Sequence, residues 1–247
     1  MDIPIWATTA VVFIVAGTVK GVVGLGLPTL AMGLLSIWMS PVSAASLMLV
    51  PSLATNAWQL ATGPSFARSC RRLWPLCVGI VGGTFLGVFP ELGSQPGMAR
   101  SALGTALFAY AVVGLFSGQL PATPARHECW VSLLMGYATG TITAATGVFV
   151  LPAVPFLQSL RLAKDDLVQA LGLSFTVSTI ALAAQLVSRG AFAPSEFVGS
   201  TAALAPALLG MWAGQKIRRR LSEARFRQGF FVGLGALGMQ MIVSAPA

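Results

Sequence analysis

The chain has 247 residues, of which 55% are hydrophobic and 9% charged, whereas an average soluble domain has roughly 25% charged residues. With a mean hydropathy of +0.81, this composition excludes a water-soluble globule and a disordered chain. The remaining class is an all-α polytopic integral membrane protein, whose length accommodates about 8–10 membrane segments. We attribute the net charge of +8 to basic residues in short loops, which determine the orientation of the chain in the bilayer. We therefore exclude nucleic acid as a partner.

The predicted membrane segments are apolar runs separated by charges and turn residues. In chain order they lie near residues 3–20, 26–39, 42–62, 73–90, 99–117, 129–143, 147–160, 167–188, 196–215 and 227–244. Two glycine-rich breaks, Lys20–Pro28 and Thr139–Gly147, each separate a longer run from a short one. Each pair is too long for one spanning helix, so we predict a broken helix or a hairpin dipping into the membrane.

The second half of the chain resembles the first at an offset of 123 residues. Gly17 falls on Gly140, and Gly24 falls on Gly147. A pattern of small residues also recurs late in each half, at 79–87 and 206–214. We therefore predict an internal duplication, with a first membrane repeat at residues 1–120 and a second at 121–247, within a single integral membrane domain.

The distribution of basic residues predicts that these repeats are inverted. The connection 63–72 carries three arginines and the connection 216–227 carries six basic residues. Their counterparts in the other repeat, 91–100 and 189–196, each balance one arginine with one glutamate. Because basic loops favour the cytoplasm, the two repeats should cross the bilayer in opposite orientations. Two inverted repeats, each of three full spans plus a broken pair, are a common architecture of secondary transporters.

The first break contains candidate substrate-binding residues. Lys20 is the only basic residue of the first apolar block, and Gly21, Gly24 and Gly26 follow it. Ionisable residues in membrane segments mark substrate or ion pathways, and an unwound glycine segment leaves backbone N–H groups available to an anion. The alternatives are a lysine that extends to the membrane surface and glycines that serve helix packing.

The second break offers hydroxyl donors in the equivalent position. Thr143 and Thr146 precede Gly147, and we predict that all three contact a bound anion. Packing through small residues is again the alternative. Because the two breaks are equivalent in the repeats, we expect the anion site between them, near the bilayer midplane.

A polar stripe marks the third predicted segment. Asn56 is the only asparagine, and Ser52, Thr55 and Gln59 share its helical face through i, i+3, i+4 and i+7 spacing. We place Asn56 and Gln59 among the substrate-binding residues. The hydroxyls of the second-half counterpart, Ser174–Thr179, have the alternative of bonding to the carbonyl four residues earlier.

Catalysis finds little support in the sequence. The sole histidine, His127, lies in a connection, and no acidic residue falls clearly within a predicted span. The three cysteines show no metal-ligand spacing. We therefore predict no enzyme activity, no catalytic residue, no metal site and no cofactor. The alternatives that stay open are a membrane-embedded enzyme acting on a lipid or peptide, and a partner subunit that does not itself transport.

Several motifs resemble the sulfite exporter TauE/SafE family, also called the four-toluene-sulfonate-uptake permeases. They are Gly17–Gly26, Met39–Ala45, Gly136–Gly140 continuing to Gly147 and Pro152, and Gly210–Arg227 ahead of the last segment. The resemblance covers almost the whole chain.

The resemblance implies a multi-pass carrier of the bacterial inner membrane. Its substrate would be a small anion, such as sulfite, an organosulfonate or a related sulfur-containing or organic acid. From the predicted inverted repeats we expect transport by alternating access. The expected partners are that anion and the lipid bilayer, with a second copy of the chain as a candidate homodimer partner.

Overall fold

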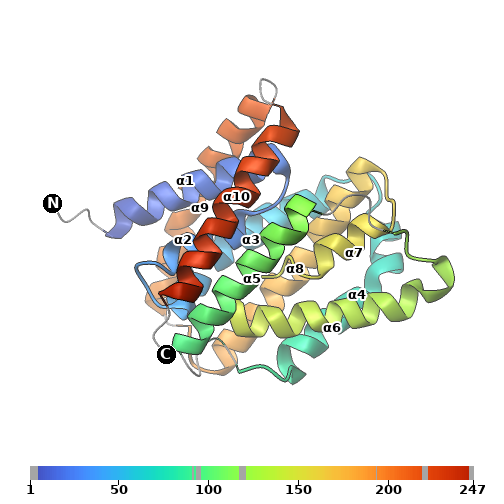
Figure 1. Cartoon of the computed structure of the whole chain (residues 1–247), viewed down its shortest axis with the longest axis horizontal. Helices are drawn as coiled ribbons and strands as arrows, with labels where there is room; N and C mark the ends of the chain where they lie inside the picture. Colours follow the sequence, from blue (N-terminus) through green and yellow to red (C-terminus); the bar gives the residue numbers. More distant parts are fainter. Residues whose placement is uncertain are drawn as a thin grey trace.

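The computed structural model describes residues 5–90, 92, 96–116, 121–192, 194–218 and 222–244. All regular structure in this part of the chain is helical (Figure 1). The helices are α1 (Ile5–Val23), α2 (Leu27–Leu35), α3 (Pro41–Ala61), α4 (Phe66–Leu86), α5 (Pro96–Phe116), α6 (Glu128–Thr146), α7 (Ala153–Ser159), α8 (Lys164–Ser188), α9 (Pro194–Arg218) and α10 (Glu223–Val243), with a 3₁₀ turn at Ala125–His127. These α-helices correspond in order to the predicted segments, which confirms the all-helical fold.

The two predicted breaks are confirmed. Gly24 and Gly26 have φ values of +85° and +104°, and these left-handed conformations end α1 and set the direction of α2. Gly147, at φ +69°, ends α6 in the same manner. The following helices are short: α2 has 9 residues and α7 has 7. Neither reaches the roughly 20 residues of a full span, so each half combines three longer helices with a broken pair.

Two helix pairs pack through glycines at four-residue spacing. A Cβ atom on Gly17 would lie 2.2 Å from the Ala207 carbonyl oxygen, and one on Gly210 would lie 2.1 Å from that of Ile14, which joins α1 to α9. Helices α4 and α6 meet in the same manner, because a Cβ atom on Gly140 would lie 2.1 Å from the Ile80 oxygen. Small residues allow this backbone approach in membranes, where no hydrophobic force drives helices together.

Helices α3 and α8 form the centre of the bundle, between the α1–α9 and α4–α6 pairs (Figure 1). Their register is antiparallel at one end: Gln59 donates to the Val168 carbonyl at 2.9 Å, and Gln169 donates to the Leu60 carbonyl at 2.7 Å. Pro51 lies inside α3, near its midpoint. The Leu47 carbonyl that a proline cannot bond accepts the Ser200 hydroxyl of α9 at 2.8 Å instead.

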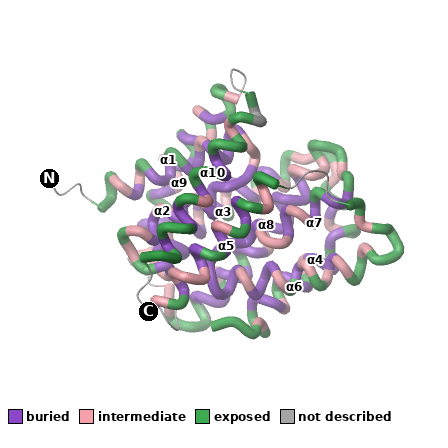
Figure 2. The backbone as a smooth tube through the Cα atoms, in the orientation of Figure 1, coloured by how far each residue is buried: buried purple, intermediate pink, exposed green. Residues whose placement is uncertain are grey.

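The outer surface is apolar, as a lipid-facing surface must be. Large hydrophobic side chains such as Val11, Val78 and Leu209 are more than two-fifths exposed, whereas the central helices are largely buried (Figure 2). Four described helical segments combine the length and hydropathy of a membrane span: Ile5–Val23, Gly97–Phe116, Lys164–Ser188 and Glu196–Arg218. The chain is therefore a multi-pass membrane protein.

Basic residues gather at one end of the bundle, where α3 and α9 finish and α4, α6, α8 and α10 begin. The Arg72–Glu128 ion pair and the bond from Ser65 N to Gln169 Oε1, at 2.7 Å, bring three of these helix starts together. We call this the basic end. Its described cations are Arg68, Arg71, Arg72, Arg126, Arg161, Lys164, Lys216, Arg218, Arg225 and Arg227.

The opposite end holds Arg100 and Arg189 among the described residues. One expectation needs correction: the arginines of 68–72 are not in a connecting loop but in the first two turns of α4, because that helix begins at Phe66. Glu91, Arg219 and Arg220, which contributed to the predicted charge asymmetry, lie outside the described residues.

Candidate functional site

A cavity of about 570 Å³ opens at the basic end. It is bounded by the end of α1 and the break that follows it, by the last turns of α3, α5 and α9, by α7, and by the first turns of α8 and α10. Segments that are far apart in the sequence therefore enclose one space. Its volume is in the range of small-ligand sites.

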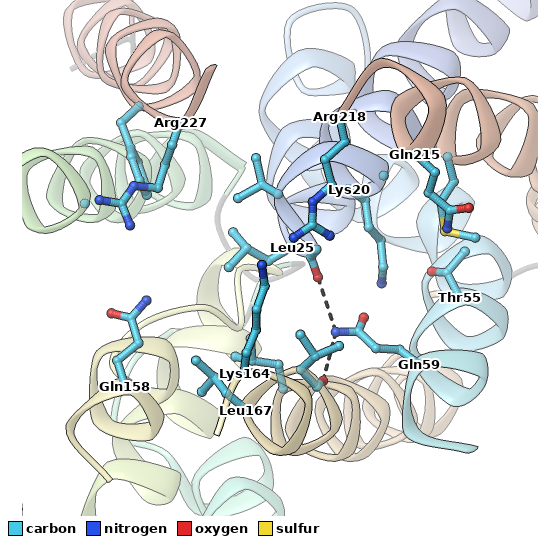
Figure 3. Close-up of a pocket in the computed structure, with 18 of the residues that line it drawn as sticks. Lys20, Leu25, Thr55, Gln59, Gln158, Lys164, Leu167, Gln215, Arg218 and Arg227 are labelled. Atoms are coloured by element: carbon cyan, nitrogen blue, oxygen red, sulfur yellow. Dashed lines mark hydrogen bonds between the residues drawn. The ribbon is translucent and has the colours of Figure 1, made fainter. Parts of the chain in front are cut away.

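The cavity lining is cationic. Lys20, Lys164, Arg218 and Arg227 line it, and no carboxylate does so among the described residues. In Figure 3, Lys20, Lys164 and Arg218 point toward the middle of the cavity, whereas Arg227 approaches from another side, nearer Gln158. Cations facing a space with apolar walls concentrate the electrostatic field there. The site is therefore suited to attract a small anion.

Lys20 lies at the inner limit of this cavity. It belongs to the last turn of α1 and is only 4% exposed. Its Nζ donates to Asn56 Oδ1 on α3, and Asn56 is fully buried. An ammonium withdrawn from water requires such a partner. Because Lys20 turns inward to Asn56, it does not extend to the outer surface of the bundle.

Gln59 ties the first break to α8. Its Nε2 donates to the Gly24 carbonyl at 3.3 Å and to the Val168 carbonyl at 2.9 Å (Figure 3). Its Oε1 is buried without a hydrogen-bond partner. The predicted polar stripe is confirmed, since all four of its side chains are buried. The structure brings three predicted residues together: Lys20 is hydrogen-bonded to Asn56, and Gln59 lies one turn further along α3.

The glycines of the first break differ in their surroundings. Gly21 and Gly24 line the cavity, but Gly26 does not. A Cβ atom on Gly21 would lie 2.3 Å from the Met211 carbonyl oxygen of α9, so close helix packing accounts for this glycine. A Cβ atom on Gly24 would meet nothing within 4 Å, and its positive φ accounts for the residue type. Gly26 packs against Phe230.

The predicted residues of the second break lie away from this cavity. The Thr143 hydroxyl donates to the Thr139 carbonyl at 2.7 Å, and the Thr146 hydroxyl donates to the Ile142 carbonyl at 2.7 Å. Gly147 faces Met32. None of the three lines the cavity. The structure therefore places only the first break at this site, and the cavity lies at one end of the bundle and not midway between the breaks.

A family model, sulfite exporter TauE/SafE, matches residues 9–241. The chain belongs to this family. No curated protein and no solved structure gives a significant match to the chain. Membership implies a membrane transporter of sulfur anions such as sulfite and not an enzyme, with a small anionic substrate and membrane lipids as its partners. The cationic cavity is consistent with that substrate class.

Sequence reasoning missed three of the cations in this TauE/SafE protein. From the sequence, Lys164 has no assigned role, and Arg218 and Arg227, within the basic connection 216–227, are attributed to orientation in the bilayer. The structure adds them to Lys20, together with Gln158 and Gln215. No local signal separates a basic loop residue that faces a cavity from one that faces water. Only the proximity of the helix ends distinguishes them.

Proposed function

We propose that this TauE/SafE protein carries a small sulfur oxyanion by alternating access, and that the cationic cavity is where the anion enters or leaves at one membrane face. The observation that supports this is the convergence of four cations without a carboxylate among the described lining residues. Lys20, Gln59 and the break at Gly21–Gly24 form its inner part. Gln59 holds this break in place beside Lys20 through its bonds to the Gly24 and Val168 carbonyls.

The proposed carrier is built from two inverted repeats, residues 1–120 and 121–247. The equivalent glycine contacts of α1 with α9 and of α6 with α4 support the duplication. In alternating access, one repeat moves against the other and a site at their interface is opened to each side in turn. Thr143, Thr146 and Gly147 belong to the break of the second repeat, and we propose that they meet the anion when the opposite side opens. Gly26 would then only form the turn that leads into α2.

The cavity faces the cytoplasm in the proposed topology. The basic end carries ten of the twelve described cations outside the α1 segment, and cationic loops stay on the cytoplasmic side. We assign the protein to the bacterial inner membrane, with homodimerisation as a further proposal. The orientation supports capture of an anion from the cytoplasm in the conformation described.

The function is tested by transport of [³⁵S]sulfite into liposomes under anaerobic conditions. We expect saturable uptake that sulfate or acetate competes for less well than unlabelled sulfite. Arg218→Gln should weaken sulfite binding to purified protein at least fivefold, because it removes one converging charge. Saturable uptake of another anion with no sulfite uptake would contradict the proposed substrate, and absence of transport of any anion would contradict the function.

The topology is tested with an impermeant thiol reagent in intact cells, after replacing Cys70, Cys77 and Cys129. Cysteine at Arg71, in the basic end, should react only after the cells are permeabilised. Cysteine at the exposed Ser188, at the other end of α8, should react from outside. The reverse pattern would place the cavity on the outer face.

A further inference from the structure

The face of α8 that lines the cavity continues below it as a polar face. Leu167 and Leu171 line the cavity, and Ser174 and Ser178 follow at i+7 and i+11 from Leu167, on the same helical face. Both serines are fully buried. They lie on either side of the midpoint of α8. A polar face this deep in a membrane helix is costly unless it serves protein, water or a ligand.

Helix α3 also has a polar face that continues from the cavity toward the middle of the helix. Gln59 and Thr55 line the cavity, and Ser52, one turn deeper on that face, is fully buried near the midpoint of α3. Because α3 and α8 are antiparallel, the depth of the serines on α8 can be compared with that of Ser52 on α3. A Cβ atom on Gly172 would lie 3.2 Å from the Asn56 carbonyl oxygen, so the α8 turn beyond it reaches the level of Asn56 and Ser52.

Ser52, Asn56, Ser174 and Ser178, which we call the polar layer, each have a side-chain polar atom without a hydrogen-bond partner. Ser52 Oγ, Ser174 Oγ, Ser178 Oγ and Asn56 Nδ2 are all buried without a hydrogen bond. The Lys20 ammonium needs an acceptor and takes Asn56 Oδ1, which turns the amide N–H groups of Asn56 away from Lys20. Unsatisfied buried donors are rare in native proteins and call for an explanation.

We propose that Ser52, Asn56, Ser174 and Ser178 form an occluded oxyanion subsite near the bilayer midplane, separate from the cavity at the basic end. This inference rests on the proposed function. The anion leaves the cavity, passes Lys20 and is held by three hydroxyls and one amide group while both membrane faces are closed. Lys20 borders both places, since it lines the cavity and binds Asn56.

The donor set favours an anion over a coupling cation. A sodium ion needs oxygen ligands, and hydroxyls could supply some of them. However, the amide nitrogen of Asn56 can only donate, and the neighbouring Lys20 would repel a cation. The described part of α3 has no acidic residue, and those of α8 are confined to its first turn. An oxyanion accepts from every group in the layer.

The test compares equilibrium binding with exchange, using [³⁵S]sulfite and purified protein. In the triple variant Ser52→Ala, Ser174→Ala, Ser178→Ala, we expect sulfite exchange in liposomes to fall at least tenfold. Binding at the cavity should change by less than threefold, because the four cations remain. Ser178→Thr in the double-alanine background should restore part of the exchange, since it returns one hydroxyl.

Matched controls are Ser46→Ala and Ser132→Ala, which remove equally buried, unpartnered hydroxyls on α3 and α6 at positions that do not continue the cavity face. They should exchange sulfite like the parent. Parental exchange by the triple variant would overturn the subsite, as would equal losses of binding and exchange. A changed sodium requirement at unchanged sulfite dependence would assign the hydroxyls to a cation. Failure of the parent to bind sulfite would instead contradict the proposed function.

Discussion

Replacement of Lys20 by glutamine tests whether its buried charge serves the anion. Gln keeps most of the length and can still donate to Asn56 Oδ1, so the change removes charge more than shape. Lys20 is 4% exposed and lines the cavity. At about 4 to 5 Å and an effective dielectric of about 20, an ammonium attracts an anion by about 3 to 4 kcal/mol.

Solvent in the open cavity screens part of this attraction. We therefore expect Lys20→Gln to lose about 2 kcal/mol of anion-binding free energy, which corresponds to about 30-fold weaker binding. Folding should not suffer, because the variant no longer buries a charge. Lys20→Arg should recover part of the affinity, since it keeps the charge but enlarges a buried group. The dissociation constant of [³⁵S]sulfite and liposome uptake are measured at matched levels of folded protein.

Arg227→Gln provides the matched control for charge. It also removes one cation from the cavity lining, but from an exposed side chain on α10, where screening by salt and water reduces the effect to about threefold or less. If Lys20→Gln binds sulfite within threefold of the parent, Lys20 serves only to hold Asn56. The reasoning from its burial would then be refuted.

Two further predictions concern the breaks and the helix pairs. The double change Thr143→Val and Thr146→Val should leave equilibrium binding of sulfite within twofold, because neither residue lines the cavity, while liposome transport falls about three- to tenfold; parental transport would assign both threonines to packing. Gly17→Ala should lower the thermal unfolding temperature of the purified protein, since its Cβ atom would lie 2.2 Å from a backbone oxygen of α9 and overpacking costs about 1–3 kcal/mol. Gly233→Ala, with nothing within 4 Å, should not lower it, and equal effects would argue against the glycine contact.

Features that depend on short-range pattern were predictable from the amino-acid sequence. Composition established a membrane protein, apolar runs located the helices, and glycine clusters located both breaks. The i, i+3, i+4, i+7 spacing put Asn56 and Gln59 on one buried face of α3. These features were predictable because hydropathy and helical periodicity act within one segment, and because left-handed backbone conformations favour glycine locally.

Which helix ends meet depends on how the helices pack in three dimensions. Lys164 and Arg218 are more than 50 residues apart, yet both face one cavity with Lys20, because α1 packs beside α9 and the start of α8 lies against the end of α3. The sequence treated both breaks alike, but in this conformation Thr143 bonds to its own helix and Lys20 reaches Asn56. Such long-range packing depends on the fit of whole helices in three dimensions, which no local pattern encodes.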